Sequence, residues 1–243
     1  MLNAIGLQGI GASRFVEEKL PELRASGATV IVNVCGTTLD EYVEVSRIVS
    51  GAEGVAAIEL NISCPNIKEG GMQFGCSLAG TFDVVNAVRK VTRLPIIPKL
   101  TPNVTDVASF ARAAEDAGAD AVSLVNTFLA MAIDVETRTP KLSNVMGGLS
   151  GPAIRPIAVR MVWECFQAVK LPIIGMGGIA TAEDAIEFLI AGASAVQVGT
   201  ANFVNPLLWS GLVAGLDAYL TRQHLAGVSD LVGTLRIPSK AHA

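Results

Sequence analysis

Short apolar runs alternate with longer amphipathic stretches along most of the chain. The runs are rich in β-branched residues and end at Gly, Pro or polar residues, which predicts strands at 29–34, 55–61, 95–100, 120–126, 172–177 and 195–200. The stretches between them have the character of helices, and one begins with a capping-box pattern, Thr38 followed by Glu41. This alternation predicts a parallel sheet covered by helices.

Two pairs of segments repeat within the chain. LPIIPKL at 94–100 recurs as LPIIGMG at 171–177, and AGADAVSLVNT at 117–127 recurs as AGASAVQVGT at 191–200. Repeated strand–helix units in one parallel sheet favour a (β/α)8 TIM barrel over a doubly wound sheet. A barrel has eight such units and the sequence contains six candidate strands, so about 60 residues of a typical barrel have no counterpart. We therefore expect a single α/β barrel domain over 1–243 with six of its eight units, entered through an N-terminal loop, MLNAIGLQG.

One segment interrupts the alternation. The segment at 128–148, FLAMAIDVETRTPKLSNVMGG, is too polar for a helix and is interrupted by Gly residues. We expect it to form an excursion over the carboxyl face of the barrel, for example a hairpin.

Composition excludes several classes of protein. The 243 residues are 51% hydrophobic and 16% charged, which is typical of a well-packed globular chain. The net charge of −4 gives no reason to expect nucleic acid or an anionic membrane as a partner. We find no apolar run long enough to span a membrane and no signal peptide, and the four cysteines lack metal or dithiol spacing. We therefore expect a cytoplasmic protein with free thiols and no metal site.

Polar side chains end four successive predicted strands: Asn33, Asn61, Lys99 and Asn126. The carboxyl ends of barrel strands carry the chemistry in this architecture. Amides donate and accept hydrogen bonds, lysine adds positive charge, and no carboxylate belongs to the set. Such a ring suits a flat, hydrogen-bonding ligand with some negative charge. The alternative is that these residues cap loops without binding anything.

Few residues are candidates for acid–base chemistry. The only histidines, His224 and His242, follow the last predicted strand, and most acidic residues read as solvated faces or helix-start charges. Cys64 lies in a loop directly after a strand, where a thiol can act as a general base if the loop encloses a substrate. The alternative is that Cys64 is a small buried hydrophobe.

Glycine-rich turns follow the last two predicted strands, as GMGGI at 175–179 and VGT at 198–200. Barrels often bind phosphate through backbone N–H groups in the loops after strands seven and eight. GGLSGPAIRP at 147–156 adds further glycine and a helix start. These turns therefore predict a phosphate site.

Several stretches together resemble the flavin-dependent dihydroorotate dehydrogenases, and specifically the class 1B catalytic subunits. They are LNAIGLQ, NISCPNIKEGGMQFG, PKLTPNV, VNTFLAMAIDVETRTPKLSNVMGGLSGPAIRP, GMGGI and VQVGTA, so the resemblance covers essentially the whole sequence. It implies an FMN-containing barrel that oxidises dihydroorotate to orotate in de novo pyrimidine biosynthesis. The first strands of the family's barrel have no counterpart here, in line with the six strands predicted above.

The resemblance also implies roles for individual residues. Cys64 would be the base that removes the C5 proton of dihydroorotate while a hydride leaves C6 for the flavin. Lys99 would stabilise negative charge on the reduced flavin. The residues that would contact the substrate are Asn3, Ala4, Ile5, Gly6, Leu7, Asn61, Asn66, Asn126 and Thr127. Those that would contact FMN are Asn33, Asn61, Lys99, Val125, Gly151, Gly177, Gly178, Gly199 and Thr200.

The class 1B resemblance further implies electron transfer to NAD through a second subunit that carries FAD and a 2Fe–2S cluster. The sequence has no GxGxxG motif after a strand and no cluster-type cysteine spacing, so those groups are expected only on the partner. We expect a homodimer of catalytic chains, each docked to one such subunit. Three alternatives stay open: a flavin barrel acting on another dihydropyrimidine, a non-redox phosphate-binding barrel, and an inactive truncated fragment.

Overall fold

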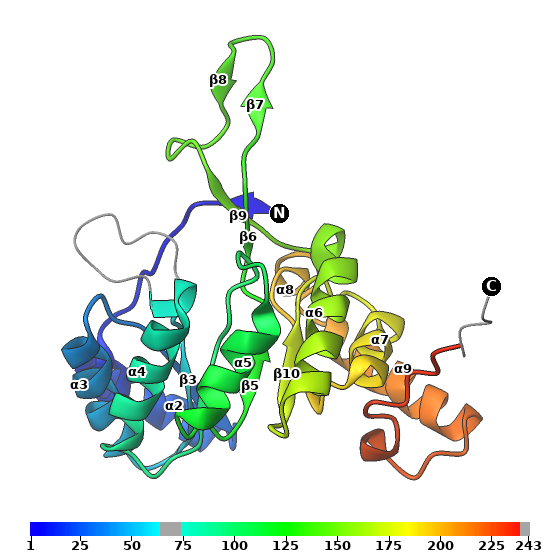
Figure 1. Ribbon diagram of the computed structural model, residues 1–243, viewed down its shortest axis with the longest axis horizontal. Helices are drawn as coiled ribbons and strands as arrows, with labels where there is room; N and C mark the ends of the chain where they lie inside the picture. Colours follow the sequence, from blue (N-terminus) through cyan, green and yellow to red (C-terminus); the bar gives the residue numbers. More distant parts are fainter. Residues whose placement is uncertain (64–73, 239–243) are drawn as a thin grey trace.

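Six parallel strands lie side by side in the order in which they occur in the chain. The computed structural model describes residues 1–63 and 74–238 (Figure 1). One group of paired strands is β2 (Val30–Val34), β3 (Val55–Leu60) and β4 (Ile96–Pro98), and the other is β5 (Val122–Leu124), β10 (Ile173–Met176) and β11 (Ala195–Gln197). A parallel bridge between Lys99 and Ser123 joins the two groups. All six strands fall within the ranges predicted from the sequence.

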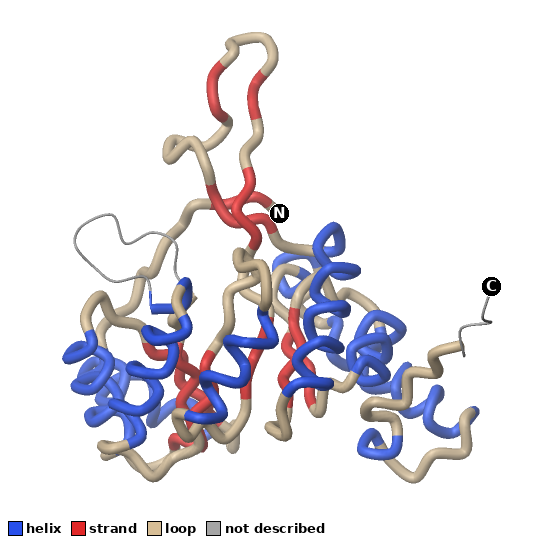
Figure 2. The backbone as a smooth tube through the Cα atoms, in the orientation of Figure 1, coloured by secondary structure: helices blue, strands red, loops and turns tan. Residues whose placement is uncertain are grey.

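Helices connect the strands and cover one face of the sheet (Figures 1 and 2). The α-helices are α1 (Ala12–Arg14), α2 (Leu20–Ala25), α3 (Leu39–Ser50), α4 (Leu78–Arg89), α5 (Val107–Asp116), α6 (Arg155–Ala168), α7 (Ala182–Ala191), α8 (Ala201–Val204) and α9 (Leu208–Arg222). Shorter turns of other helix types are η1 (Phe15–Lys19), η2 (Phe74–Cys76), η3 (Pro152–Ile154) and η4 (Val228–Asp230). None of the helices in the described ranges has the length and apolar character needed to cross a membrane.

Capping explains where several helices begin. Thr38 caps α3 by accepting a hydrogen bond from the Glu41 backbone, as the sequence predicts, but the Glu41 carboxylate accepts from the Thr37 backbone instead of from Thr38. The predicted capping box is therefore only half formed at α3. A complete capping box is found at α7, between Thr181 and Asp184.

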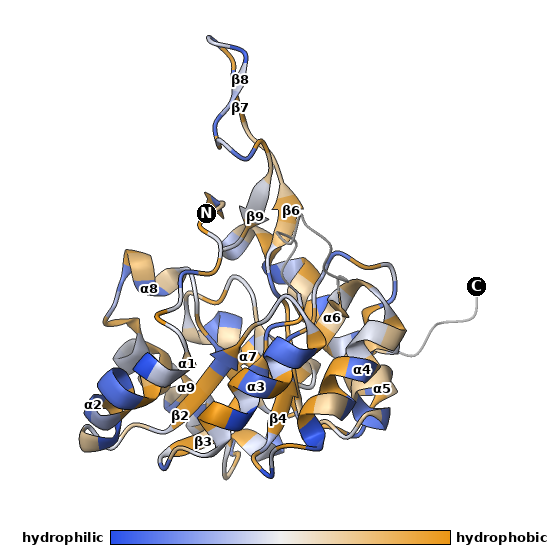
Figure 3. Cartoon of the chain, turned by 90° about the vertical axis from the view of Figure 1, so that its left-hand side faces the viewer, coloured by the Kyte–Doolittle hydropathy of each residue, from blue (hydrophilic) through white to orange (hydrophobic). Residues whose placement is uncertain are grey.

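The apolar core lies between the strands and the helices. On β3, Ile58 and Leu60 are fully buried and belong to the same core cluster as Val84 and Val88 of α4. Figure 3 shows β2, β3 and β4 coloured as mainly hydrophobic, with mixed colouring on the covering helices. Side chains alternate between the two faces of a strand, so Glu59 lies on the opposite face from Ile58 and Leu60.

The sheet is strongly curved. Glu59 of β3 and Gln197 of β11 form a side-chain hydrogen bond of 3.1 Å, although their strands are second and sixth in the order. In a flat sheet these strands would be roughly 19 Å apart, which two side chains cannot span. The sheet therefore bends back on itself, so that β11 approaches β3. The outer edges of β2 and β11 have no paired strand in the described part of the chain, so no closed barrel is formed there.

Residues 128–149 form an antiparallel hairpin that stands above the carboxyl ends of the parallel strands (Figure 1). Its strands are β6 (Phe128–Ala130), β7 (Ile133–Asp134), β8 (Thr139–Pro140) and β9 (Gly147–Leu149). The N-terminal segment was expected to be a loop, but Leu2–Asn3 forms a short strand, β1, paired with β9. This pairing satisfies backbone groups along the free edge of β9.

Candidate active site

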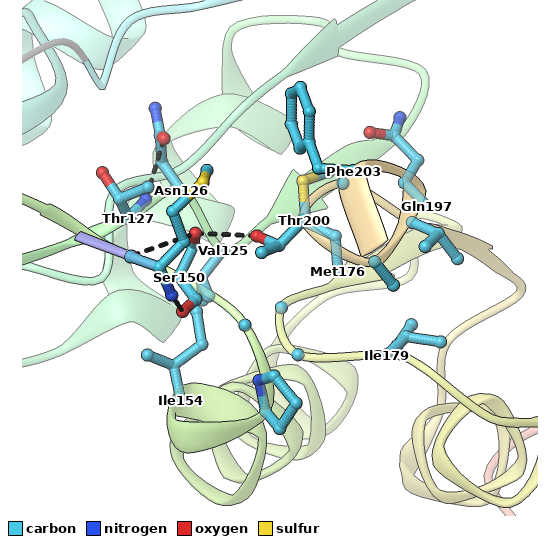
Figure 4. Close-up of a pocket in the computed structure, with 18 of the residues that line it drawn as sticks. Val125, Asn126, Thr127, Ser150, Ile154, Met176, Ile179, Gln197, Thr200 and Phe203 are labelled. Atoms are coloured by element: carbon cyan, nitrogen blue, oxygen red, sulfur yellow. Dashed lines mark hydrogen bonds between the residues drawn. The ribbon is translucent and has the colours of Figure 1, made fainter. Parts of the chain in front are cut away.

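Two adjoining cavities open at the carboxyl ends of the parallel strands. The larger has a volume of about 270 Å³ and the smaller about 150 Å³. Both are lined by Asn3, Asn126 and Thr127, so these three residues form their common wall. Figure 4 shows the larger cavity, with Asn126, Thr127 and Ser150 on one side and Phe203, Gln197 and Ile179 on the other.

Four glycines lie in the wall of the larger cavity. Gly151, Gly177 and Gly178 have φ angles of 90°, 127° and 82°, a region that side chains disfavour. At Gly199 an added Cβ would meet nothing within 4 Å, so that backbone borders open space. Backbone without side chains lets an anionic group approach N–H donors closely. Five of the residues predicted to contact FMN, all from the glycine-rich turns, line this cavity: Gly151, Gly177, Gly178, Gly199 and Thr200.

The turn that carries Gly177 and Gly178 is fixed from behind. The buried Asp184 carboxylate accepts hydrogen bonds from the backbone of Ala180 and Thr181, at 2.9 and 3.0 Å, and pairs with Arg155. Across the cavity, Thr200 Oγ1 lies 2.7 Å from Ser150 Oγ (Figure 4). These contacts hold the glycine wall in one shape.

Side-chain amides form part of the wall of the smaller cavity. Asn61 and Asn126 line it, and Asn126 donates to the Ser63 hydroxyl, which in turn donates to Asn61 at 3.1 Å. The Asn126 oxygen accepts from the Thr127 backbone at 2.8 Å, which fixes its orientation. Asn103 supports this wall by donating to the Thr127 carbonyl at 3.0 Å. The cavity thus presents hydrogen-bonding groups in fixed positions.

The N-terminal loop forms one side of the smaller cavity. Asn3, Ala4, Ile5, Gly6 and Leu7 all line it, and the β1–β9 pairing holds the start of this loop in place. At Gly148 an added Cβ would lie 2.4 Å from Thr127 Oγ1, so the hairpin backbone packs directly on that side chain. All the residues that were predicted to contact the substrate, and that lie within the described ranges, therefore line this one cavity.

The predicted cofactor residues divide into three groups. Lys99 and Val125 line the larger cavity together with the glycine wall. Asn61 lines the smaller cavity instead. Asn33 lines neither of these two cavities and donates a hydrogen bond of 2.6 Å to Glu59. Cys64 and Asn66 lie outside the described residues.

A carboxylate belongs to the ring of polar side chains at the strand ends, contrary to the prediction. Glu59 is 5% exposed and lies 3.7 Å from the Lys99 ammonium. Most acidic residues of the chain lie on helices, but Glu59 lies within an apolar strand, so the prediction was wrong. The alternation of Ala57, Glu59 and Asn61 along one strand already places Glu59 on the same face as Asn61.

The described cysteines differ in accessibility. Cys165 of α6 is fully buried, and this burial raises the pKa of its thiol to about 12. Cys76 is exposed. Cys165 thus belongs to the core and contributes no reactive thiol. Within residues 1–63 and 74–238, no three metal-binding side chains form a cluster.

Comparisons with known proteins find matches over most of the chain. A sequence profile described as dihydroorotate dehydrogenase matches residues 1–220. A Porphyromonas gingivalis protein named dihydroorotate dehydrogenase B (NAD(+)), catalytic subunit, is 56% identical over 237 residues, which is 98% of this chain and 77% of the relative. Proteins of the same name from Desulforudis audaxviator and Geobacter sulfurreducens are 55% and 52% identical, covering 96% and 98% of this chain and 76% and 78% of the relatives.

Proposed function

The chain belongs to the dihydroorotate dehydrogenase family, and we propose that its two cavities are the flavin and substrate halves of one active site. The chain is an oxidoreductase that oxidises dihydroorotate to orotate in pyrimidine biosynthesis. One observation carries the proposal: a glycine-walled cavity and an amide-lined cavity share Asn3, Asn126 and Thr127. Two ligands bound there would touch each other, which a transfer between them requires.

FMN is the cofactor that we assign to the larger cavity. The glycine wall and Thr200 suit its phosphate, because backbone N–H groups can approach an anion where no Cβ intervenes. Lys99 and Val125 would lie against its ring, near the common wall. When bound, FMN supplies the hydride acceptor of the reaction.

Dihydroorotate is the ligand that we assign to the smaller cavity. Its ring carries N–H and C=O groups, which the amides of Asn61 and Asn126 can bind as both donors and acceptors. Thr127 adds a hydroxyl, and the loop from Asn3 to Leu7 excludes water from one side. We expect Asn66 to contribute a further amide. Fixed polar groups of this kind orient a ring for transfer to a neighbouring ligand.

Cys64 is the base in this proposal. In the sequence it directly follows Ser63, whose hydroxyl accepts a hydrogen bond from Asn126 at the amide-lined cavity. A thiolate that takes the C5 proton leaves an electron pair that forms the ring double bond as the hydride departs from C6. A cysteine thiol ordinarily ionises at about pH 8.5 and can fill this role where a serine hydroxyl cannot without a further base.

The parallel strands and their curvature bear on the overall fold. We assign the six parallel strands to a (β/α)8 barrel, supported by their order and by the Glu59–Gln197 contact across the curved sheet.

The relatives are named as catalytic subunits acting with NAD(+), so we also propose a separate electron-transfer subunit that carries FAD and a 2Fe–2S cluster. The catalytic chains themselves would form a homodimer.

The spectrum of the purified protein tests the function. We expect a yellow protein whose flavin absorbance is bleached by dihydroorotate without oxygen, and not by dihydrouracil. A colourless protein that cannot take up added FMN would favour the non-redox or fragment alternatives. Bleaching by dihydrouracil would instead indicate another dihydropyrimidine as substrate.

The variant Cys64→Ser tests the base. We expect flavin bleaching to slow by about 100-fold or more at neutral pH, because a hydroxyl is far less acidic than a thiol. FMN affinity should stay within about twofold, since Cys64 is not assigned to the glycine-walled cavity. Stopped-flow absorbance measures the rate, and an unchanged rate would remove Cys64 from the mechanism. Cys76→Ser is the matched control, because that thiol is exposed and the same substitution buries no hydroxyl there.

A further inference from the structure

A single buried carboxylate connects five of the six parallel strands. Glu59 Oε1 accepts hydrogen bonds from Ser123 at 2.7 Å and from Gln197 at 3.1 Å. Glu59 Oε2 accepts from Asn33 at 2.6 Å and lies 3.7 Å from the Lys99 ammonium. These partners come from β2, β5 and β11 and from the residue that follows β4.

The carboxylate lies behind the flavin cavity and does not line it. Lys99 and Gln197 line that cavity, whereas Glu59 is absent from its wall among the described residues. The side chain of Lys99 is 20% exposed and that of Glu59 is 6% exposed. Glu59 therefore makes no direct contact with a ligand in the cavity, and it can act there through its charge or by holding Lys99 and Gln197.

The charges of this pair affect the cavity in opposite directions. A cation at the wall favours the reduced form of a bound acceptor, because reduction adds negative charge next to it. A carboxylate directly behind that cation weakens this effect. The pair is shielded from solvent, so each charge acts more strongly than it would in water. The three hydrogen bonds keep the carboxylate in place and offset its desolvation.

We propose that Glu59 is a positioning residue that holds the Lys99 ammonium at the cavity wall and offsets its charge, so that it lowers the reduction potential of the bound flavin. The inference rests on the proposed assignment of the larger cavity to FMN. A lower potential favours the onward transfer of electrons to an acceptor on another subunit. Glu59 thus links the packing of five strands to the electron affinity of the site.

Opposite shifts in potential test this inference. Glu59→Gln removes the charge and keeps the shape, and the Ser123 hydroxyl and neighbouring amides can turn to meet its N–H groups. We expect the reduced-to-oxidised equilibrium of bound FMN to rise at least tenfold, which is about 30 mV for two electrons. Lys99→Ala should shift the potential downwards, and the double variant should lie between the two single variants.

Controls separate the charge of Glu59 from its packing. Ser123→Ala removes one hydrogen bond and keeps the carboxylate, so it should lower the melting temperature and leave the reduced-to-oxidised equilibrium of bound FMN within about twofold of the wild type. If Glu59→Gln fails to fold, Glu59→Asp serves instead. Its side chain is one methylene shorter, so the carboxylate lies further from Lys99, and the potential should rise by a smaller amount. FMN affinity, measured by fluorescence, reports whether each variant is loaded.

Each outcome decides for or against the inference. An upward shift in Glu59→Gln with a downward shift in Lys99→Ala supports it. If the potential of bound FMN in the Glu59 variants that fold is unchanged or lower than in the wild type, the inference is overturned, and Glu59 acts only in packing. If the wild type binds FMN and is bleached by dihydroorotate, such a result leaves the proposed function intact. A wild type that binds no FMN overturns both.

Discussion

The two cavities share a wall but are built from different chemical groups. The larger is lined by glycine backbone from the turns after β10 and β11 and before α6. The smaller is lined by side-chain amides and by the loop from Asn3 to Leu7. Backbone donors accept any ligand with a suitably placed anion, whereas oriented amides select a ring with matching donors and acceptors. Ligand binding in the larger cavity should therefore be weakened by side-chain atoms added to its glycines. Binding in the smaller cavity should be weakened by the loss of its amide groups.

Gly178→Ala should have the largest effect. Its Cβ would lie 2.7 Å from the Gly151 carbonyl and 2.9 Å from Arg155 Cβ, at a φ of 82°. The strain of that backbone region alone is about 1–2 kcal/mol, and the turn must also move. We expect FMN affinity to fall by about 100-fold and the melting temperature without FMN to fall by roughly 4–8 °C.

Two other glycines sharpen this test. Gly199→Ala places its Cβ in open space, so it should weaken FMN binding and leave the melting temperature without FMN unchanged. Gly211→Ala, on the exposed side of α9, should change neither FMN affinity nor substrate binding. Fluorescence titration with FMN and thermal melting separate the three variants. A Gly178→Ala protein that binds FMN normally would refute the glycine-wall assignment.

Asn126→Ala should affect the smaller cavity more than the larger, although Asn126 lines both, because its hydrogen bonds to Ser63 and Thr127 shape the amide wall. The variant loses the amide that bonds to Ser63 and leaves the Thr127 backbone without its 2.8 Å partner. Loss of a buried hydrogen-bonding group costs about 1–3 kcal/mol, so we expect KM for dihydroorotate to rise by about 30-fold. FMN affinity should change by less than about threefold. Steady-state kinetics with saturating FMN measures the first effect, and a larger loss of FMN affinity than of substrate binding would contradict the division of the site.

Much of this division could be predicted from the sequence, because the strands and their ends are local features. The β-branched runs mark the strands, and the residues that follow them, such as Lys99 and Asn126, fall at the cavities. Glycines in GMGGI could be assigned to a phosphate wall because their backbone freedom is a property of the residue itself. The β1–β9 pairing, in contrast, joins residues far apart in the chain and carries no local signal.

The Glu59 cluster shows where local reasoning stops. A carboxylate within an apolar strand is itself a signal, since alternation places it on the face of Asn61. Its partner Gln197 is 138 residues away, and the contact depends on the curvature of the whole sheet. The same dependence explains Asn33, whose amide is directed to Glu59 by the position of β2 beside β3. Long-range register therefore decides these contacts.

The smallest predicted effects come from two asparagines that support the cavities from outside, one for each. Asn103 donates to the Thr127 carbonyl at 3.0 Å and accepts from the Leu129 backbone at 2.9 Å, so it steadies two residues of the smaller cavity. Asn202 donates to the Val198 carbonyl at 2.7 Å, beside the larger cavity. Hydrogen bonds of this kind contribute about 1 kcal/mol each.

The two alanine variants should therefore act on different ligands. Asn103→Ala should raise KM for dihydroorotate by about fivefold and leave FMN affinity unchanged, whereas Asn202→Ala should weaken FMN binding by a similar factor and leave KM unchanged. Each variant is the control for the other, because each removes an asparagine amide with no assigned ligand contact. Steady-state kinetics with saturating FMN and fluorescence titration measure the two effects. If both variants changed both quantities equally, the cavities would respond as one unit, and the distinction between a backbone-walled and an amide-walled half would be lost.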